Sequence, residues 1–307
     1  MTPTHLPASY TDLAPIARGA FGEVWRARHE AFGPVAVKLL APDQGGDPEA
    51  AWRFGQEFRR LQGLAVPHVP RAHEAGLSAD GTPYFAMALA PGRSPEGPLP
   101  AAQVRALLVA LAEALAGLHA AGLTHGDLKR ENVVVADDGA VALVDLALAM
   151  PIGAAREGFA GTPAYLAPEA WRGAAHAPAA DWYALGVLGY WLATGHPPFE
   201  GAGATLARAH AQDLPTLPAD LPELAALLAK DPARRAAGVA ALGVTPRPFA
   251  GLQPVDLPPR PLDDAPWHAA LAGGGSVWLV GLEGGGKTRT LDAWRLDAAA
   301  AGRAWLA

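Results

Sequence analysis

The most constraining feature of the sequence is the octapeptide His-Gly-Asp-Leu-Lys-Arg-Glu-Asn at residues 125–132. Its last residue, Asn132, is the single asparagine in a chain of 307 residues. A β-type run at 140–144 follows and leads directly into Asp145. A polar loop followed by a short strand that ends in a carboxylate is improbable by chance, so we expect this stretch to carry the chemistry of the chain.

Lysine is almost as scarce as asparagine, because alanine, glycine, proline and arginine dominate the composition. Only Lys38, Lys129, Lys230 and Lys287 are present, and all but Lys230 lie in motifs typical of phosphate binding. A chemical need explains their retention better than drift. We expect Lys230, which precedes Asp231-Pro232, to be an ordinary surface residue.

The composition predicts a globular protein of roughly two domains, since half of the residues are apolar. A net charge of −6 with scattered arginines gives no indication of a nucleic acid or an anionic membrane as partner. The chain has no cysteine, which excludes disulfides, thiolate metal sites and cysteine nucleophiles and suits a reducing compartment.

Neither a signal peptide nor a membrane segment is expected. The first residues have no basic region and no apolar core. The most apolar window, residues 101–121, is interrupted by Gln103, Arg105 and Glu113. We therefore expect a cytoplasmic protein.

The first hundred residues predict a small β-rich unit. Residues 13–40 alternate short β-type runs with glycine turns, and residues 84–89 resemble a further strand that ends near Gly92. Between them, residues 49–64 have the spacing of a helix. The apolar face of this helix would consist of Phe54, Phe58, Leu61 and Ala65.

Helical patterns dominate the rest of the chain, at residues 101–121, 180–194 and 221–230. Prolines then recur through residues 246–266, a composition that favours an extended linker. A new unit is expected to begin near Trp267.

A glycine-rich turn at residues 18–24 contains Gly19 and Gly22 between two predicted strands. Without side chains at these positions, backbone N–H groups can approach a phosphate. An ordinary hairpin turn would have the same composition, so the turn alone leaves both interpretations open.

Lys38 closes the apolar strand segment Val-Ala-Val-Lys, and Glu57 lies on the following helix at a spacing that would let the two side chains pair. A lysine on a buried strand is costly unless it is paired. The pair would either be purely structural or hold Lys38 toward the α- and β-phosphates of a nucleotide.

The polar loop supplies what transfer of a γ-phosphoryl group requires, namely a carboxylate near the acceptor hydroxyl, a cation near the phosphoryl group and metal ligands. Asp127 would accept or orient the acceptor proton, and Lys129 would stabilise the transferred group. Asn132 and Asp145 would bind the metal ion that bridges the phosphates.

Together these motifs resemble the protein kinase family, over approximately residues 10–243. Residues 161–169 are similar to the substrate-docking segment with its closing Ala-Pro-Glu, and residues 181–186 to the central buried helix. The resemblance implies that Asp181 orders the backbone of the polar loop. It also implies that Arg235 pairs with Glu169.

The implied fold is α+β and bilobal, with a kinase domain at 1–245, a small β-rich lobe at about 10–92 and a larger helical lobe at about 93–245. The implied cofactors are ATP and Mg²⁺ or Mn²⁺. Met87 would guard the back of the nucleotide pocket, and the backbone around Leu89 would face adenine. The full set of implied nucleotide-binding residues in this domain is Gly19, Gly22, Val24, Ala36, Lys38, Glu57, Met87, Leu89 and Asp145.

Lys129 together with Thr162 resembles the Ser/Thr-specific branch of the family, and the short segment 199–222 resembles its bacterial members. Three residues depart from the family pattern. Ala17 replaces the first glycine of the glycine-rich turn, Gly126 replaces an arginine before Asp127, and Ala147 replaces the glycine after Asp145. None of the three removes a catalytic group.

A second glycine loop lies at residues 281–288, between a strand-like run at 276–280 and a helix-like segment at 289–301. This order fits the Walker-A motif, in which Gly286 and its neighbours would cradle phosphates, Lys287 would reach their oxygens and Thr288 would hold magnesium. Residues 267–307 thus resemble the start of a P-loop NTPase domain and would form only a fragment of one. A glycine-rich linker is the alternative.

Three functions remain open from the sequence. The first is an active ATP-dependent Ser/Thr protein kinase that acts on a protein substrate. The second is a pseudokinase or scaffold that binds nucleotide and regulates the ATPase-like segment. The third is a small-molecule phosphotransferase, because His-Gly-Asp with a later asparagine also resembles the aminoglycoside and choline kinases; Lys129, Thr162 and the Ala-Pro-Glu closure at 167–169 argue against it.

Overall fold

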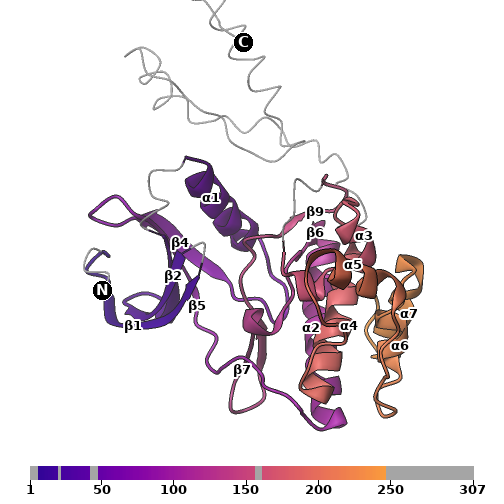
Figure 1. Cartoon of the computed structure of the whole chain (residues 1–307). Coiled ribbons are helices and arrows are strands. Elements are labelled where there is room, and N and C mark those ends of the chain that lie inside the picture. The colour runs from indigo at the N-terminus through magenta and orange to yellow at the C-terminus, as the bar shows by residue number, and fades with distance from the viewer. Residues whose placement is uncertain (1–5, 20–21, 42–47, 156–160, 247–307) are drawn as a thin grey trace, which may run out of the picture. The chain divides into compact units, whose positions relative to one another are not determined.

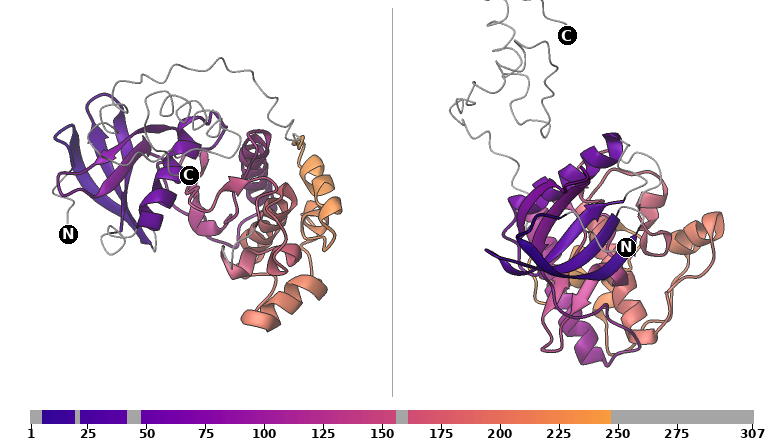
Figure 2. Two further views of the ribbon diagram at one scale, coloured as in Figure 1. Left: turned by 90° about the horizontal axis from the view of Figure 1, so that it is seen from above. Right: turned by 90° about the vertical axis from the view of Figure 1, so that its left-hand side faces the viewer.

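The computed structural model describes residues 6–19, 22–41, 48–155 and 161–246. The chain divides into two compact units, Met1–Gly251 and Leu252–Ala307, and only the first contains described residues. The glycine loop with Gly286, Lys287 and Thr288, and nearly all of the proline-rich segment, therefore lie outside the described residues. Figures 1 and 2 show that the described part consists of a strand-rich N-terminal region and a helical C-terminal region.

The N-terminal region is built on a five-stranded antiparallel sheet in the order β1-β2-β3-β5-β4. One face packs with helix α1 and the main core, whereas the other covers a separate cluster that includes Trp25, Val35 and Tyr84. Successive side chains of a strand point to opposite faces, so Lys38 shares the α1 face with Ala36 and Leu40. The elements are β1 (Tyr10–Gly19), β2 (Gly22–His29), β3 (Gly33–Leu40), α1 (Pro48–Gln62), β4 (Ala72–Leu77) and β5 (Pro83–Ala88).

Helix α1 is anchored by aromatic contacts with the sheet. The ring of Phe85 on β5 lies 5.0 Å from that of Phe54 and 5.9 Å from that of Phe58, and Leu61 is buried beside them. Because the helix ends at Gln62, before Gly63, the prediction that Ala65 belongs to its apolar face is wrong.

The C-terminal region is organised around two long helices, α2 and α4, which pack against each other. A Cβ atom at Gly189 of α4 would lie 2.9 Å from Leu224 and 3.0 Å from Leu108, so glycine is what lets α2 and α6 approach this closely. The helices are α2 (Ala101–Ala120), α3 (Pro168–Trp171), α4 (Pro178–Thr194), α5 (Gly203–Gln212), α6 (Glu223–Leu227) and α7 (Ala236–Ala241).

Helix α2 is the one helix of the described chain that is long and apolar enough to cross a membrane by length and composition. In the fold, 56% of its apolar stretch is buried inside the protein. Leu108, Leu111 and Leu115 are fully enclosed there, so a role as a core helix accounts for the composition.

The prediction of a helix over residues 221–230 is wrong in extent. Helix α6 covers only Glu223–Leu227, because the chain leaves the helix at Leu228 and turns toward the segment that contains Arg235. The carbonyl of Lys230 accepts a hydrogen bond from Arg235 at 3.3 Å in this turn.

The same turn overturns the prediction that Lys230 is an ordinary surface residue. Its Nζ atom is buried and lies 4.3 Å from the ring centre of Phe199 and 5.9 Å from that of Tyr183. The sequence around Lys230 resembles an exposed turn, but in the fold its ammonium lies against the rings of Phe199 and Tyr183.

Four short strands pair beside α2 and carry the polar loop. Strand β6 (Leu123–Thr124) pairs with β9 (Met150–Pro151), and β7 (Val133–Val135) pairs with β8 (Val141–Leu143). A hydrogen bond of 2.7 Å from the Leu143 N–H to the His68 carbonyl connects β8 to the segment after α1.

Candidate active site

The loop at residues 125–132 begins directly after β6 and is held by a carboxylate from α4. Asp181 accepts hydrogen bonds from the backbone N–H groups of His125 at 2.8 Å and Gly126 at 3.0 Å. Its third partner is Nε2 of His119, at 2.8 Å. Burial opposes the charge of Asp181, but these donors hold its pKa below the ordinary value. Asp181 thus orders the loop as the family resemblance implied.

His119 is a residue of this support that sequence reasoning missed. It is 2% exposed and lies near the end of α2. The sequence signal for it was a histidine within an otherwise apolar helical pattern. A buried polar side chain is expected to have a hydrogen-bond partner.

Gly126 is required by the local backbone. Its φ of 79° lies in the left-handed region, and a Cβ atom would stand 2.6 Å from the Leu148 carbonyl oxygen. The segment after Asp145 therefore passes against the loop where other members of the family carry an arginine.

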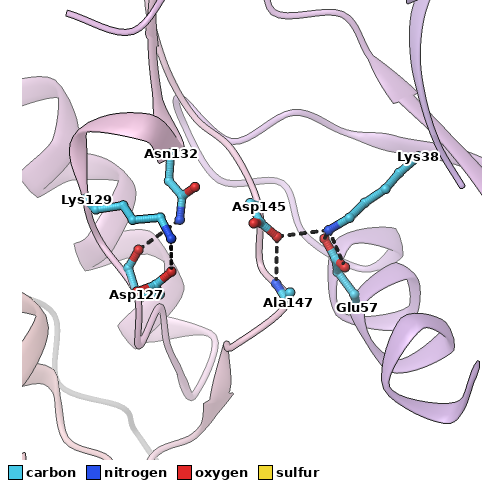
Figure 3. A network of polar contacts seen from close by, with 7 residues as sticks. All are labelled: Lys38, Glu57, Asp127, Lys129, Asn132, Asp145 and Ala147. Carbon is cyan, nitrogen blue, oxygen red and sulfur yellow. Dashed lines mark hydrogen bonds and ion pairs between the residues drawn. The ribbon is translucent and has the colours of Figure 1, made fainter. Parts of the chain in front are cut away.

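Asp127 lies at the centre of the loop, and its two carboxylate oxygens have different partners. One oxygen accepts from both the backbone N–H and the hydroxyl of Thr162, each at 2.8 Å. The other accepts from Lys129 Nζ at 2.7 Å, and the Asn132 amide donates to the Asp127 carbonyl at 2.9 Å (Figure 3). The structure thus brings the three predicted catalytic residues together with Thr162.

Lys38 forms the second polar centre, with carboxylates on two sides. Its Nζ atom lies 2.7 and 2.8 Å from the oxygens of Glu57 and 3.0 Å from Asp145 (Figure 3). Burial alone would lower the pKa of Lys38, but the two carboxylates raise it above its ordinary value, so the ammonium stays charged. Burial raises the pKa of Glu57 to about 7, with Lys38 opposing that rise.

Asp145 has a left-handed backbone with φ of 66°, and its carboxylate accepts from the Ala147 N–H at 3.2 Å. Although burial disfavours its charge, Lys38 and this N–H hold its pKa below the ordinary value. Ala147 does not have a positive φ. The backbone at this position therefore does not need the glycine that the family pattern has.

The donor set fits a divalent cation and a nucleotide. The Asn132 nitrogen is engaged with the Asp127 carbonyl, so its oxygen is the atom that would face a cation, and Asp145 would contribute carboxylate oxygen. Oxygen ligands of this kind suit Mg²⁺ and Mn²⁺. No cluster of three His, Asp or Glu side chains that could hold a metal occurs among the described residues.

The predicted nucleotide-contacting residues come from neighbouring strands of the sheet. Ala36 on β3 pairs in register with Met87 on β5, and both are buried. Gly19 and Gly22 pair across the end of the β1–β2 hairpin, and the two residues at its tip lie outside the described chain. Val24 on β2 and Leu89 just after β5 are partly buried and pack on the same core.

Arg235 and Glu169 form the ion pair that the resemblance implied. The Arg235 side chain is fully buried, and Nη2 lies 2.8 Å from Oε2 of Glu169, beside a second, shorter contact between Nη1 and Oε1. Carbonyl groups of Ala179 and Ala229 accept two more bonds at 2.8 Å. This network fixes the end of the docking segment against the base of α4.

A small hollow opens beside Asp127 on the docking-segment side. Its walls combine two carboxylates, Asp127 and Asp181, and the hydroxyl-bearing Thr162 and Tyr165 with small or aliphatic side chains. The aliphatic part of the lining is formed by Leu128, Leu166, Ala167 and Ala184, among others.

The fold and the site define a protein kinase. A family model described as "Protein kinase domain" matches residues 10–236, most of the chain. The chain therefore belongs to the protein kinase family.

Among curated proteins, the chain is similar to the "Probable serine/threonine-protein kinase PkwA" of Thermomonospora curvata, with 34% identity over 70% of this chain and 31% of that protein. It is also similar to the "Serine/threonine-protein kinase PknA" of Mycobacterium tuberculosis, with 37% identity over 72% of this chain and 56% of that protein. The corresponding values for PknL of Mycobacterium tuberculosis are 35%, 73% and 57%. The chain spans between about a third and slightly more than half of these relatives.

Proposed function

We propose that the chain transfers the γ-phosphate of ATP to serine or threonine hydroxyls of protein substrates, with Mg²⁺ or Mn²⁺. The observation that carries this proposal is the convergence of Lys129 and Thr162 on the carboxylate of Asp127. A carboxylate held by one cation and one hydroxyl can receive a second, incoming hydroxyl at the same place.

In this proposal the residues of the chain divide the work between binding and orientation. Asn132 and Asp145 would hold the metal ion, which when bound would neutralise charge on the phosphates. Lys38 would grip the α- and β-phosphates, and Glu57 keeps its ammonium directed because the two groups form a buried ion pair. Asp127 would orient the acceptor hydroxyl and take up its proton, while Lys129 would stabilise charge on the transferred group.

The small hollow next to Asp127 supports a protein acceptor. The aliphatic part of its lining, with Leu166, Ala167 and Ala184, would suit a small apolar side chain next to the phosphorylated residue. Lys129, Thr162 and the Ala-Pro-Glu closure at 167–169 argue against an aminoglycoside or choline as the acceptor.

Two further proposals rest on the sequence alone. Residues 267–307, with Gly286, Lys287 and Thr288, would begin a P-loop NTPase domain to which the kinase domain is fused. The protein would act in the cytoplasm. If the kinase domain bound nucleotide without transferring phosphate, a regulatory role toward that second domain would be the alternative function.

The test is a transfer assay with labelled ATP, Mg²⁺ and a generic protein substrate, followed by phosphoamino-acid analysis. Asp127→Asn should lower the rate by about 10²–10⁴-fold while nucleotide affinity stays unchanged, because only the positioning carboxylate is lost. Asp137→Asn is the matched control, since Asp137 is an exposed carboxylate in the turn between β7 and β8.

Equal rates in Asp127→Asn and the wild type would contradict the assignment. Label on tyrosine would contradict the Ser/Thr specificity. Nucleotide binding without transfer in the wild type would favour the regulatory alternative, and transfer to an aminoglycoside or choline but to no protein would favour the third function.

A further inference from the structure

The last turn of α1 places Arg60 against Met150 of strand β9. Nη2 of Arg60 contacts the sulfur of Met150 at 3.7 Å. The Nε atom of Arg60 is buried and has no hydrogen-bond partner among the described residues. Burial lowers the pKa of Arg60, an effect that Glu57 only partly offsets. A thioether is a weak acceptor, so among the described residues no strong acceptor bonds the guanidinium.

Met150 lies on β9, next to the strand that leads into the loop with Asp127. It pairs in register with Thr124 of β6, which leads directly into the loop with Asp127. The Thr124 hydroxyl donates to the Met150 carbonyl at 3.2 Å. Any change at this side chain therefore acts on the junction between α1, β6 and β9.

Methionine is the only sulfur-containing residue type in the chain. It contains no cysteine and three methionines, of which Met1 lies outside the described residues. Met87 is buried, whereas Met150 is partly exposed. Susceptibility of a thioether to oxidation follows its exposure, so Met150 is the more reactive of the two.

We propose that Met150 is a site of reversible oxidation by peroxides and that Arg60 binds the sulfoxide product. In the reaction the O–O bond of the peroxide breaks and one oxygen atom forms a bond to the sulfur of Met150. The sulfur loses two electrons, and the peroxide is reduced to water or an alcohol. In the product, a strongly polar sulfoxide oxygen replaces the weakly accepting thioether as hydrogen-bond acceptor. The guanidinium of Arg60 already lies beside the sulfur and can donate to it.

The expected consequence is a firmer connection between α1 and β9. Charge-assisted hydrogen bonds are roughly twice as strong as neutral ones. Glu57 lies on the same helix, one turn before Arg60, so the new bond would also steady the Lys38–Glu57 pair. This regulatory consequence rests on the proposed kinase function, whereas the oxidation and the new bond do not.

The experiment titrates the whole chain with hydrogen peroxide and follows Met87 and Met150 separately by peptide mass spectrometry. Met150 should be oxidised before Met87, and the melting temperature should then rise by about 2–5 °C. Met150→Leu, which keeps the volume, and Arg60→Met, which removes the donor, should both lack the rise. A methionine sulfoxide reductase should reverse it in the wild type.

The proposal is overturned if Met150 is oxidised no earlier than Met87. It is also overturned if the melting temperature of the oxidised wild type stays level or falls, or if Arg60→Met shows the same rise. Arg60→Lys, which keeps the charge and one donor group, should retain part of the rise and so separates loss of the bond from misfolding. These readouts require no phosphotransfer, so their failure leaves the kinase assignment intact.

Discussion

Replacing Lys230 by methionine should stabilise the kinase domain at neutral pH. The ammonium of Lys230 is buried and has no hydrogen-bond partner among the described residues. Its surroundings are the rings of Phe199 and Tyr183, together with His210, whose pKa is lowered to about 4 by burial and by Lys230 itself. Burial disfavours the charged form, with Asp213 opposing and Arg235 adding to this effect, so the pKa of Lys230 falls to about 8.

The size of the effect follows from this pKa. Each pKa unit corresponds to about 1.4 kcal/mol, so the fall from 10.5 to about 8 amounts to about 3 kcal/mol at most. Lys230 is only partly buried as a residue, and solvent screening reduces this to about 1–2 kcal/mol. The attraction of the ammonium to the Phe199 ring offsets about 0.5–1 kcal/mol. The net gain in Lys230→Met is therefore about 1 kcal/mol.

The pH dependence gives the sharper test of the cause. Between the folded pKa of about 8 and the unfolded value of 10.5, the unfolded chain binds the proton and the folded chain does not. Stability of the wild type therefore rises with pH across this window. The advantage of Lys230→Met should be complete below about pH 8 and should vanish by about pH 10.5.

The assay is thermal unfolding of wild type and Lys230→Met at several pH values. At pH 7 the melting temperature should differ by about 2–4 °C, the shift typical of 1 kcal/mol in a domain of this size. Arg234→Met is the matched control, because Arg234 is an exposed cation in the same turn and should change stability little. A Lys230→Met variant that is less stable than the wild type, or whose advantage does not change with pH, would refute the argument.

Three other outcomes follow from the structure. Arg235→Met should destabilise the domain by about 3–5 kcal/mol in urea unfolding, because it leaves the Glu169 carboxylate without its buried partner. Stability should fall as the pH drops from 6.5 toward 4, since the folded pKa of His210 is lowered to about 4; thermal melts of His210→Gln should lack that part of the loss. Phosphatase treatment should leave the specific activity in a transfer assay nearly unchanged, because the only hydroxyl side chains between residues 145 and 169 are Thr162 and Tyr165, within the docking segment.

The parts of the site that chemistry dictates were predictable from the sequence. Lys38 needs a carboxylate partner wherever it is buried, and Glu57 provides it. Arg235 and Glu169 lie far apart in the chain, yet both belong to recognisable motifs, so their ion pair could be expected. The Lys38–Glu57 pair follows from the cost of a buried charge, whereas the Arg235–Glu169 pair was implied by the family resemblance.

Features that depend on packing were not predictable in the same way. Helix α5, at Gly203–Gln212, escaped prediction, and α6 is shorter than its apolar pattern suggests. Lys230 was misjudged because its neighbours in sequence are polar, whereas its neighbours in space are Phe199 and Tyr183. Local composition sets a weak preference that tertiary contacts override.

The three departures from the family pattern are each accommodated by the backbone. Ala17 continues the β1 ladder opposite Val24 and is exposed, so it needs no glycine. Ala147 does not have a positive φ, and its N–H donates to Asp145. Gly126 combines a left-handed φ with the close approach of the Leu148 carbonyl.

The loss of arginine at position 126 is therefore coupled to the path of the segment after Asp145. A side chain at this position would have to displace the Leu148 carbonyl, which lies 2.6 Å from the place of its Cβ atom. That carbonyl belongs to the turn that leads into Met150 and its contact with Arg60. Positioning of this segment thus depends on direct packing against the loop and α1. We therefore expect that it needs no phosphate to neutralise an arginine before Asp127, in keeping with the scarcity of hydroxyl side chains in the segment.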